Sequence, residues 1–163
     1  MAHDPMSTRI QFPVVIPFVE ELGLELHRFD HGHAEVQVDL DDAHLNSWEV
    51  AHGGVLMTLL DVAMAHAARS IHAKQPDHGM GVVTVEMKTS FMRPAQGRLV
   101  AKGTLLHQTS TMAFCEASVR DDDNQLCAHA TGTFKYLRRL PAKGPKGRSV
   151  KSGQQRTPPE PTP

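Results

Sequence analysis

Residues 51–72 read AHGGVLMTLLDVAMAHAARSIH, and this stretch decides the fold class. After the glycine pair Gly53 and Gly54, nearly every residue is apolar, and alanines are frequent. A helix that is apolar almost all the way round is buried on most of its faces, unlike an amphipathic helix at a surface. The stretch therefore predicts one long central helix, whose small side chains allow a sheet to approach closely.

Alternating apolar and polar residues on both sides of this helix predict β-strands. Before the helix, residues 24–29 and 34–40 alternate around a turn at 30–32. After it, four further strands are expected at residues 83–91, 98–107, 112–120 and 126–137. In the first of these four, the apolar positions are Val83, Val85, Met87 and Phe91. The last three lie close together and predict an antiparallel meander, so the layout is α+β, with one helix against one face of a sheet.

The chain of 163 residues has the length of one domain, and its composition is that of a globular protein. Apolar residues make up 40% and charged residues 21%. Aromatic residues are only 5%, and residues 1–140 carry a net charge of −5, so we expect no nucleic-acid partner. The sequence contains neither a run of 18 apolar residues nor a signal-like N-terminus. We therefore expect a cytoplasmic protein with no membrane partner.

The N-terminal region predicts a short helix, and the C-terminal region predicts a tail. Pro17 is placed to begin a helix through Glu21, which Gly23 would end. Residues 141–163 hold six of the eleven prolines and carry a net charge of +4, and they have too few apolar residues to fold. The chain is therefore divided into an N-terminal extension (1–11), one folded domain (12–140) and a disordered basic tail (141–163).

Familiar catalytic and metal-binding motifs are missing from the sequence. There is no GxSxG, no HExxH and no GxxxxGK[ST]. His31 and His33 lie in a predicted turn, where exposed histidines are commoner than a metal site. Cys115 lies in the middle of a strand on its apolar face, which favours an inert buried thiol. With Cys127 as the second cysteine, no disulfide framework is expected.

Asp61 is the exception within the apolar helix. No cation lies within one turn of it on either side. An unpaired carboxylate in apolar surroundings is costly. Asp61 therefore either faces a solvent channel, hydrogen-bonds to a nearby strand, or has a catalytic task, and the helix alone leaves these alternatives open.

The start of the helix offers a second candidate group. His52, Gly53 and Gly54 precede the apolar run, and the bare backbone N–H groups of a helix start suit a developing oxyanion. The alternative is that the glycines only permit close packing. Gly53 and Asp61 are about 12 Å apart along the helix axis, too far to flank one reacting carbon. If both are catalytic, a symmetric dimer with antiparallel helices is needed, with two equivalent sites.

The chain resembles the hotdog-fold acyl-CoA thioesterases of the PaaI (phenylacetate-degradation) type, in the 4-hydroxybenzoyl-CoA thioesterase superfamily. The motif consists of Asn46, His52, Gly53, Gly54 and Asp61. Residues 83–95 and 134–137 fit the same pattern, so the resemblance covers residues 12–140. It implies a curved antiparallel sheet around a central helix, assembled into homodimers and usually homotetramers. It also implies hydrolysis of an acyl-CoA substrate, with no metal and no other cofactor.

The resemblance also implies roles for individual residues. The Gly53 N–H would bind the thioester carbonyl, and Asp61 of the other subunit would be general base or nucleophile. Asn46 and His52 would shape the site and hold the water, and Thr84 would orient the nucleophile. The further expected substrate or CoA contacts are Gly54, Phe91, Arg93, His107, Gln108, Thr109, Ser110 and Thr111.

Two features depart from the family pattern. The family often has glycine at position 49, where this chain has Glu49 preceded by Trp48, and we expect this bulk to alter the acyl pocket. The hairpin at 108–111 lacks the basic residue often found there, so the CoA phosphates would need other cations. The candidates are Arg93, Arg98 and Lys102.

Two other functions stay open at this point. A hydratase or dehydratase of acyl thioesters with this fold typically uses a histidine and an acid at the helix start, whereas Asp61 lies well inside the helix. A non-catalytic acyl-CoA-binding module would be expected to carry an effector domain, for which 163 residues leave no room. The acyl group itself, whether aryl or short, medium or long chain, is not indicated by the sequence.

Overall fold

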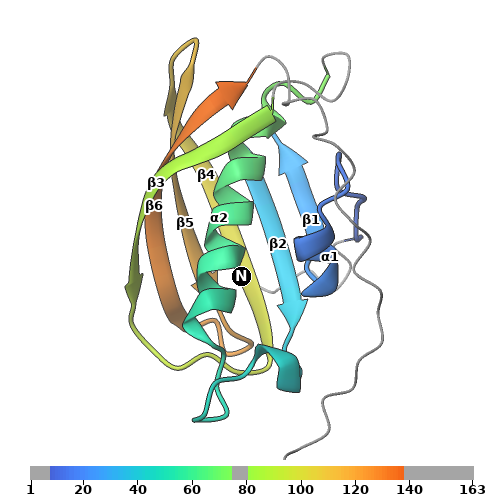
Figure 1. Ribbon diagram of the computed structural model, residues 1–163, viewed down its shortest axis with the longest axis vertical. Helices are drawn as coiled ribbons and strands as arrows, with labels where there is room; N and C mark the ends of the chain where they lie inside the picture. The colour runs from blue at the N-terminus through green and yellow to red at the C-terminus, as the bar shows by residue number, and fades with distance from the viewer. Residues whose placement is uncertain (1–7, 75–80, 138–163) are drawn as a thin grey trace, which may run out of the picture.

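A single antiparallel sheet curves around helix α2 in the computed structural model, which describes residues 8–74 and 81–137 (Figure 1). The elements are α1 (Pro17–Glu21), β1 (Glu25–Asp30), β2 (His33–Asp39), the 3-10 turn η1 (Asp42–His44), α2 (Gly53–Ser70), β3 (Gly81–Phe91), β4 (Arg98–Gln108), β5 (Met112–Arg120) and β6 (Leu126–Leu137). The predicted helices and strands are confirmed, with ends that differ by a few residues. The predicted tail lies outside the described residues, as does most of the N-terminal extension.

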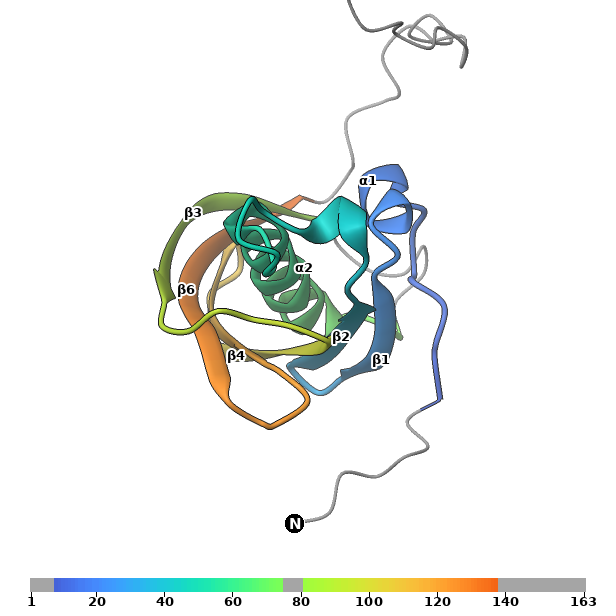
Figure 2. The same cartoon turned by 90° about the horizontal axis from the view of Figure 1, so that it is seen from below.

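The strands lie in the order β1-β2-β4-β5-β6-β3. The predicted meander is confirmed, because β4, β5 and β6 are consecutive neighbours. Strand β3 pairs with β6, the last strand of the chain, and is therefore an edge of the sheet. Register shifts interrupt four of the five pairings, and such bulges increase the local twist of a sheet. The sheet consequently bends into the C-shaped wrap that is visible along the helix axis in Figure 2.

Strand β3 corrects one expectation from the sequence. The alternation predicts that Val83, Val85, Met87 and Phe91 share one face. A register shift between Thr84 and Glu86 breaks this alternation. Val83 and Val85 are exposed, whereas Thr84 reaches Asp61 on α2 and Met87 packs against the core.

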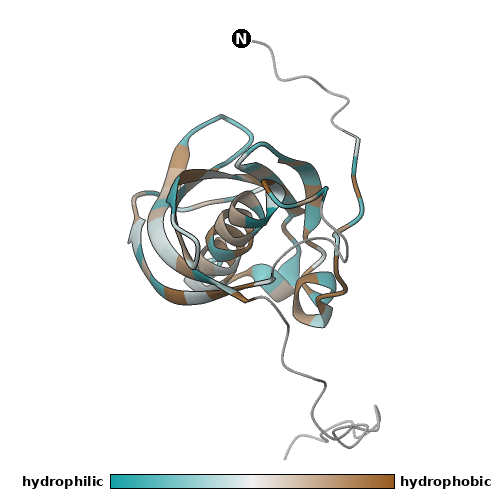
Figure 3. Ribbon diagram, turned by 90° about the horizontal axis from the view of Figure 1, so that it is seen from above, coloured by the Kyte–Doolittle hydropathy of each residue, from teal (hydrophilic) through white to brown (hydrophobic). Residues whose placement is uncertain are grey.

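Helix α2 is buried by the sheet on most of its sides, as its apolar sequence predicts. Figure 3 shows the helix as pale to brown, the apolar colours, along most of its length inside the sheet. The backbones approach closely at Gly103 of β4, where a Cβ atom would collide with the backbone carbonyl of Ala63. Glycine at 103 is therefore required for the sheet to lie this close to the helix.

One stripe of α2 is left uncovered by the sheet. It is formed by Gly54, Met57, Thr58, Asp61 and Ala65, all of which are exposed or half-buried. Their spacing of three or four residues places them on one face of the helix. We call this face the open stripe.

The N-terminal strap, residues 9–24, lies beside α2 near this stripe and includes α1 (Figure 2). Its first residues are attached to β1: Ile10 N–H donates to the Leu26 carbonyl at 2.8 Å, and Arg9 pairs with Glu25 at 2.9 Å. Further along, the ring of Phe12 packs against His66 of α2. The strap thus continues the enclosure of α2 beyond the edge of the sheet.

The loop before α2 contains a residue in the left-handed region, Glu49, with φ of +57°. Asn46 closes the loop, because its Oδ1 accepts from Trp48 N–H at 2.8 Å and its carbonyl accepts from Glu49 N–H at 3.0 Å. The family resemblance noted in the sequence implies glycine at this position. The left-handed conformation costs a residue with a Cβ atom roughly 1–2 kcal/mol.

Replacing Glu49 with glycine is expected to raise the free energy of unfolding by up to about 1 kcal/mol, since the relief of strain exceeds the added chain entropy. The matched control is Asn124→Gly, because Asn124 has φ of +59° but asparagine tolerates that region. Urea denaturation of both variants measures the difference. An unchanged or lowered stability for Glu49→Gly would contradict the account of this loop.

Candidate active site

The carboxylate of Asp61 is held by a strand across from the helix. Thr84 Oγ1 on β3 donates to Asp61 Oδ1 at 2.7 Å. Oδ2 has no partner among the residues the structure describes. Burial raises the pKa of Asp61, and the Thr84 hydrogen bond partly offsets this by lowering it. The hydrogen bond to a strand, one of the alternatives from the sequence, is therefore present, and it leaves one carboxylate oxygen available.

A largely apolar cavity of about 350 Å³ opens beside this carboxylate, between α1, α2 and β3. Asp61 is its only charged group within the described part of the chain. Such a cavity suits an apolar ligand oriented by one polar group. The lining residues are Ile16, Phe18, Val19, Met57, Thr58, Asp61, Val62, Ala65, His66 and Met87.

The start of α2 offers one free N–H group rather than the two expected from the glycine pair. His52 is the N-cap, and its Nδ1 accepts from Gly54 N–H at 2.9 Å. The expectation that the Gly54 N–H is free for substrate is therefore wrong. Within residues 8–74 and 81–137, Gly53 N–H has no hydrogen-bond partner, and it lies at the positive end of the helix dipole.

Two of the predicted residues lie close to Gly53. A Cβ atom at position 53 would be 3.6 Å from the ring of Phe91, so this ring borders the helix start. Because His52 Nδ1 accepts a hydrogen bond, the neutral ring carries its proton on Nε2. His52 therefore presents a donor, not a base, to anything bound at this end of α2.

Asn46 is tied into the loop that leads to the helix. Its N–H donates to the Val50 carbonyl at 2.9 Å, and its Oδ1 holds Trp48 N–H. The Nδ2 group of Asn46 makes no hydrogen bond within the described residues and is left to contact a water or a substrate. Trp48 itself is 83% exposed and does not line the cavity, so the expected change to the acyl pocket is not seen within one chain.

The hairpin from His107 to Thr111 lies at the other end of α2. Tyr136 Oη is 3.0 Å from the Ala68 carbonyl and 3.3 Å from Gln108 Oε1, which places the hairpin beside the last turns of the helix. Ala68 is about 22 Å along the axis from Gly53. One chain therefore does not bring the hairpin and the helix start together.

The three candidate cations for the CoA phosphates differ in whether a carboxylate already pairs with them. Arg98 makes two hydrogen bonds to Asp39, at 2.7 and 3.2 Å, and Lys102 pairs with Glu35 at 3.4 Å. Arg93 contacts the Leu126 carbonyl at 3.3 Å and has no carboxylate partner within the described residues. Of the three, Arg93 is the one left to meet an anionic ligand.

Other candidates from the sequence do not form sites. Cys115 is buried, and burial raises the pKa of its thiol to about 12, so a thiolate nucleophile is unavailable. Residues 8–74 and 81–137 contain no group of three or more His, Cys, Asp or Glu side chains arranged to hold a metal ion.

Neither helix in this part of the chain has the length and apolar character that crossing a membrane requires.

Several cavity-lining residues are not among the site residues predicted from the sequence. Met57 and Ala65 belong to the open stripe, and Met87, Ile16 and Phe18 reach the cavity from β3 and the strap. The spacing of Met57, Asp61 and Ala65 at four residues was a usable signal for the stripe. Nothing local in the sequence indicates that the strap reaches the same place.

Comparison with known proteins supports the same interpretation. Residues 49–128 match the family model described as the thioesterase superfamily. A protein provisionally named an esterase, from Archaeoglobus fulgidus, is 30% identical over 116 residues, which cover 70% of this chain and 71% of the relative. The medium/long-chain acyl-CoA thioesterase YigI of Salmonella typhimurium is 26% identical over 133 residues, 73% of this chain and 84% of the relative.

Solved structures share the architecture over most of their length. A conserved protein from Pseudomonas aeruginosa is 31% identical with a TM-score of 0.69, covering 77% of this chain and 97% of that one. A variant of the phenylacetic acid degradation protein PaaI from Thermus thermophilus is 28% identical with a TM-score of 0.65, covering 75% and 100%. With its helix wrapped by a curved antiparallel sheet, this chain belongs to the thioesterase superfamily and has the hotdog fold.

Proposed function

We propose that the protein hydrolyses acyl-CoA thioesters as a homodimer. The observation that carries the proposal is Asp61, whose carboxylate keeps one oxygen free at the wall of an apolar cavity. The names of relatives such as YigI support an acyl-CoA substrate, and the apolar lining supports an acyl group as the cavity's occupant.

The proposed chemistry needs one base and one oxyanion donor. As general base, Asp61 takes a proton from water, and the water oxygen forms a bond to the thioester carbon. The Gly53 N–H stabilises the resulting oxyanion at the positive end of the helix. When the carbon–sulfur bond breaks, the CoA thiolate leaves and takes the proton from Asp61. In the alternative, Asp61 attacks the carbon itself, the carbon–sulfur bond breaks and the CoA thiolate leaves. Water then hydrolyses the mixed anhydride, which regenerates the carboxylate of Asp61, and the proton that the water releases goes to the thiolate.

Two chains are required because Gly53 and Asp61 lie about 12 Å apart along one helix. Strand β3 supports such an assembly, since its eleven residues form a sheet edge with unpaired backbone groups. The exposed Val83 and Val85 on this strand add apolar surface next to Thr84. A second copy docked here would bring its Gly53 toward Asp61, and each dimer would have two sites.

The hydratase alternative is disfavoured by His52. Its Nδ1 is occupied by Gly54 N–H, so the ring has no free lone pair for a base at the helix start. A non-catalytic acyl-CoA-binding module would bind acyl-CoA without hydrolysing it, so a measurement of turnover distinguishes it from a thioesterase. Thiol release from a panel of aryl-CoAs and acyl-CoAs of increasing length tests the proposal, and binding without release for every member would contradict it.

Mixed dimers test whether the site is shared. Gly53→Val crowds the free N–H, and Asp61→Asn removes the base, so each homodimer is expected to be nearly inactive. In a mixed dimer one site carries both changes and the other neither, so co-refolding is expected to restore up to about a quarter of wild-type activity for random pairing. Each variant refolded alone is the control. Inactive heterodimers, verified by pull-down on two different tags, would show that the site is not shared.

Asp61 is also expected to cost stability at neutral pH. Its pKa is higher in the folded than in the unfolded chain, because burial disfavours the charge. Below the pKa of the unfolded chain Asp61 is protonated in both states and the folded protein keeps its full stability. That stability is lost progressively as the pH rises through the folded pKa, because the buried carboxyl group must then ionise. Asp61→Asn should raise the melting temperature at pH 7, and the gain should vanish as the pH falls below about 4.

The control for this comparison is Asp123→Asn, at an exposed turn residue whose side chain makes no hydrogen bond or ion pair with the described residues. It is expected to leave the melting temperature nearly unchanged. Equal effects of the two substitutions at pH 7 would mean that Asp61 is solvated rather than buried at the cavity wall.

A further inference from the structure

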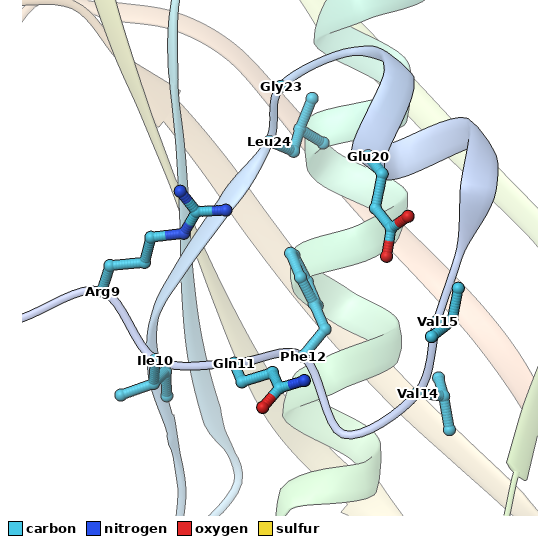
Figure 4. A pocket seen from close by; sticks show the side chains of 9 residues that line it. All are labelled: Arg9, Ile10, Gln11, Phe12, Val14, Val15, Glu20, Gly23 and Leu24. Atoms are coloured by element: carbon cyan, nitrogen blue, oxygen red, sulfur yellow. The ribbon is translucent and has the colours of Figure 1, made fainter.

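Phe12 of the N-terminal strap lies between two cavities. The first is the cavity beside Asp61, and His66 is part of its wall. The second, of about 410 Å³, lies within the strap, and Phe12 is part of its lining (Figure 4). The rings of Phe12 and His66 pack edge to face, with centroids 5.1 Å apart. This ring pair therefore separates the two spaces.

The two cavities also share the short helix α1 as a partition. Of the residues of α1, Phe18 and Val19 line the cavity beside Asp61, whereas Glu20 lines the strap cavity. Figure 4 shows Phe12 and Glu20 pointing into the space that the strap encloses, from opposite sides. Movement of the Phe12 ring is thus the change that would join the two spaces past His66.

His66, which lines the cavity beside Asp61, is a buried histidine with one ring nitrogen left unpartnered by the part of the chain that the structure describes. Its side chain is only 2% exposed, and its Nδ1 lies 2.8 Å from the Val62 carbonyl, to which it donates. Its Nε2 is buried and has no partner among the described residues. A buried acceptor without a donor costs roughly 1–3 kcal/mol, so a completed core would not be expected to place one here.

The strap that carries Phe12 is lightly attached. Its anchors at this end are the Ile10–Leu26 hydrogen bond and the Arg9–Glu25 ion pair. Exposed ion pairs of this kind contribute little to stability. Val15 of the strap is 76% exposed, whereas Phe12 and Ile16 are half-buried and pack against the core. Displacing Phe12 thus costs this packing and its contact with His66, but breaks no hydrogen bond of its side chain.

We propose that Phe12 is the residue that limits the length of the acyl chain. This rests on the proposed function, with the thioester at Asp61. An acyl chain that starts there runs along α2 past Ala65 and ends at the Phe12–His66 pair. Asp61 and His66 are about 7.5 Å apart along the helix axis, which limits the chain to a modest length. A longer chain reaches the strap cavity, whose lining mixes apolar side chains (Ile10, Val14, Val15, Leu24) with polar ones (Arg9, Gln11, Glu20), only when Phe12 moves aside.

The test is the dependence of kcat/KM on acyl-chain length for the full-length protein and three variants. Phe12→Ala opens the partition and is expected to raise kcat/KM for the longer saturated acyl-CoAs about tenfold relative to the shorter ones. Phe12→Leu keeps an apolar contact with His66 and is expected to shift the profile less, in the same direction. The matched control is Phe29→Ala, because Phe29 also packs edge-on against His66, at 5.9 Å, but lines neither cavity.

The outcomes separate this inference from the proposed function. An unchanged length profile in folded Phe12→Ala and Phe12→Leu would overturn the role of Phe12. An equal shift in Phe29→Ala would also overturn it, because loosening around His66 would then be the cause. If the wild-type protein hydrolyses no acyl-CoA of any length, the proposed function fails, and the inference fails with it.

Discussion

The sheet can cover helix α2 on most of its sides because the backbone of β4 at Gly103 lies close to the backbone of α2 at Ala63. That approach needs glycine on the strand and small side chains on the helix, and both are present. The sheet then has to bend strongly, which the register shifts in its strand pairs allow. A sheet bent this far still does not close, since β1 and β3 remain separate edges. The uncovered part of α2 is the open stripe, and the candidate active site lies on it.

The position of Asp61 follows from this incomplete enclosure. A carboxylate on the covered side of α2 would have no water and no partner, whereas on the open stripe it has Thr84 on one side and a cavity on the other. Its burial disfavours the charged form, and a raised pKa makes a carboxylate a stronger base. The site thus gives up some stability for reactivity, as functional sites commonly do. Because the free Gly53 N–H lies far along the same helix, the chemistry we propose depends on a second chain.

The features that depend on local pattern could be predicted from the sequence, and those that depend on distant contacts could not. The apolar run after Gly53 predicts α2, and alternation predicts the strands. The placement of β3 beside β6 has no local signal, and the break in register after Thr84 reverses the face that Val83 and Val85 occupy. Asp61 is conspicuous because it is a lone charge among apolar residues. That Phe12 reaches α2 at all depends on a three-dimensional contact that residue spacing does not encode. The hydrogen bond from Gly54 N–H to His52 is local, but histidine is not among the residues usually expected at an N-cap.

We propose that the Thr84 hydroxyl tunes the pKa of Asp61 as the catalytic base, and the pH dependence of kcat/KM for acyl-CoA hydrolysis tests this proposal most directly. Thr84→Val removes the hydrogen bond that lowers the pKa of Asp61, so the base stays protonated to higher pH. The acidic limb of the profile is therefore predicted to move to higher pH in Thr84→Val. It should stay in place in Thr89→Val, a matched change on the same strand at a hydroxyl that has no partner in the described structure. An acidic limb at the same pH in the wild type and in Thr84→Val would contradict the account.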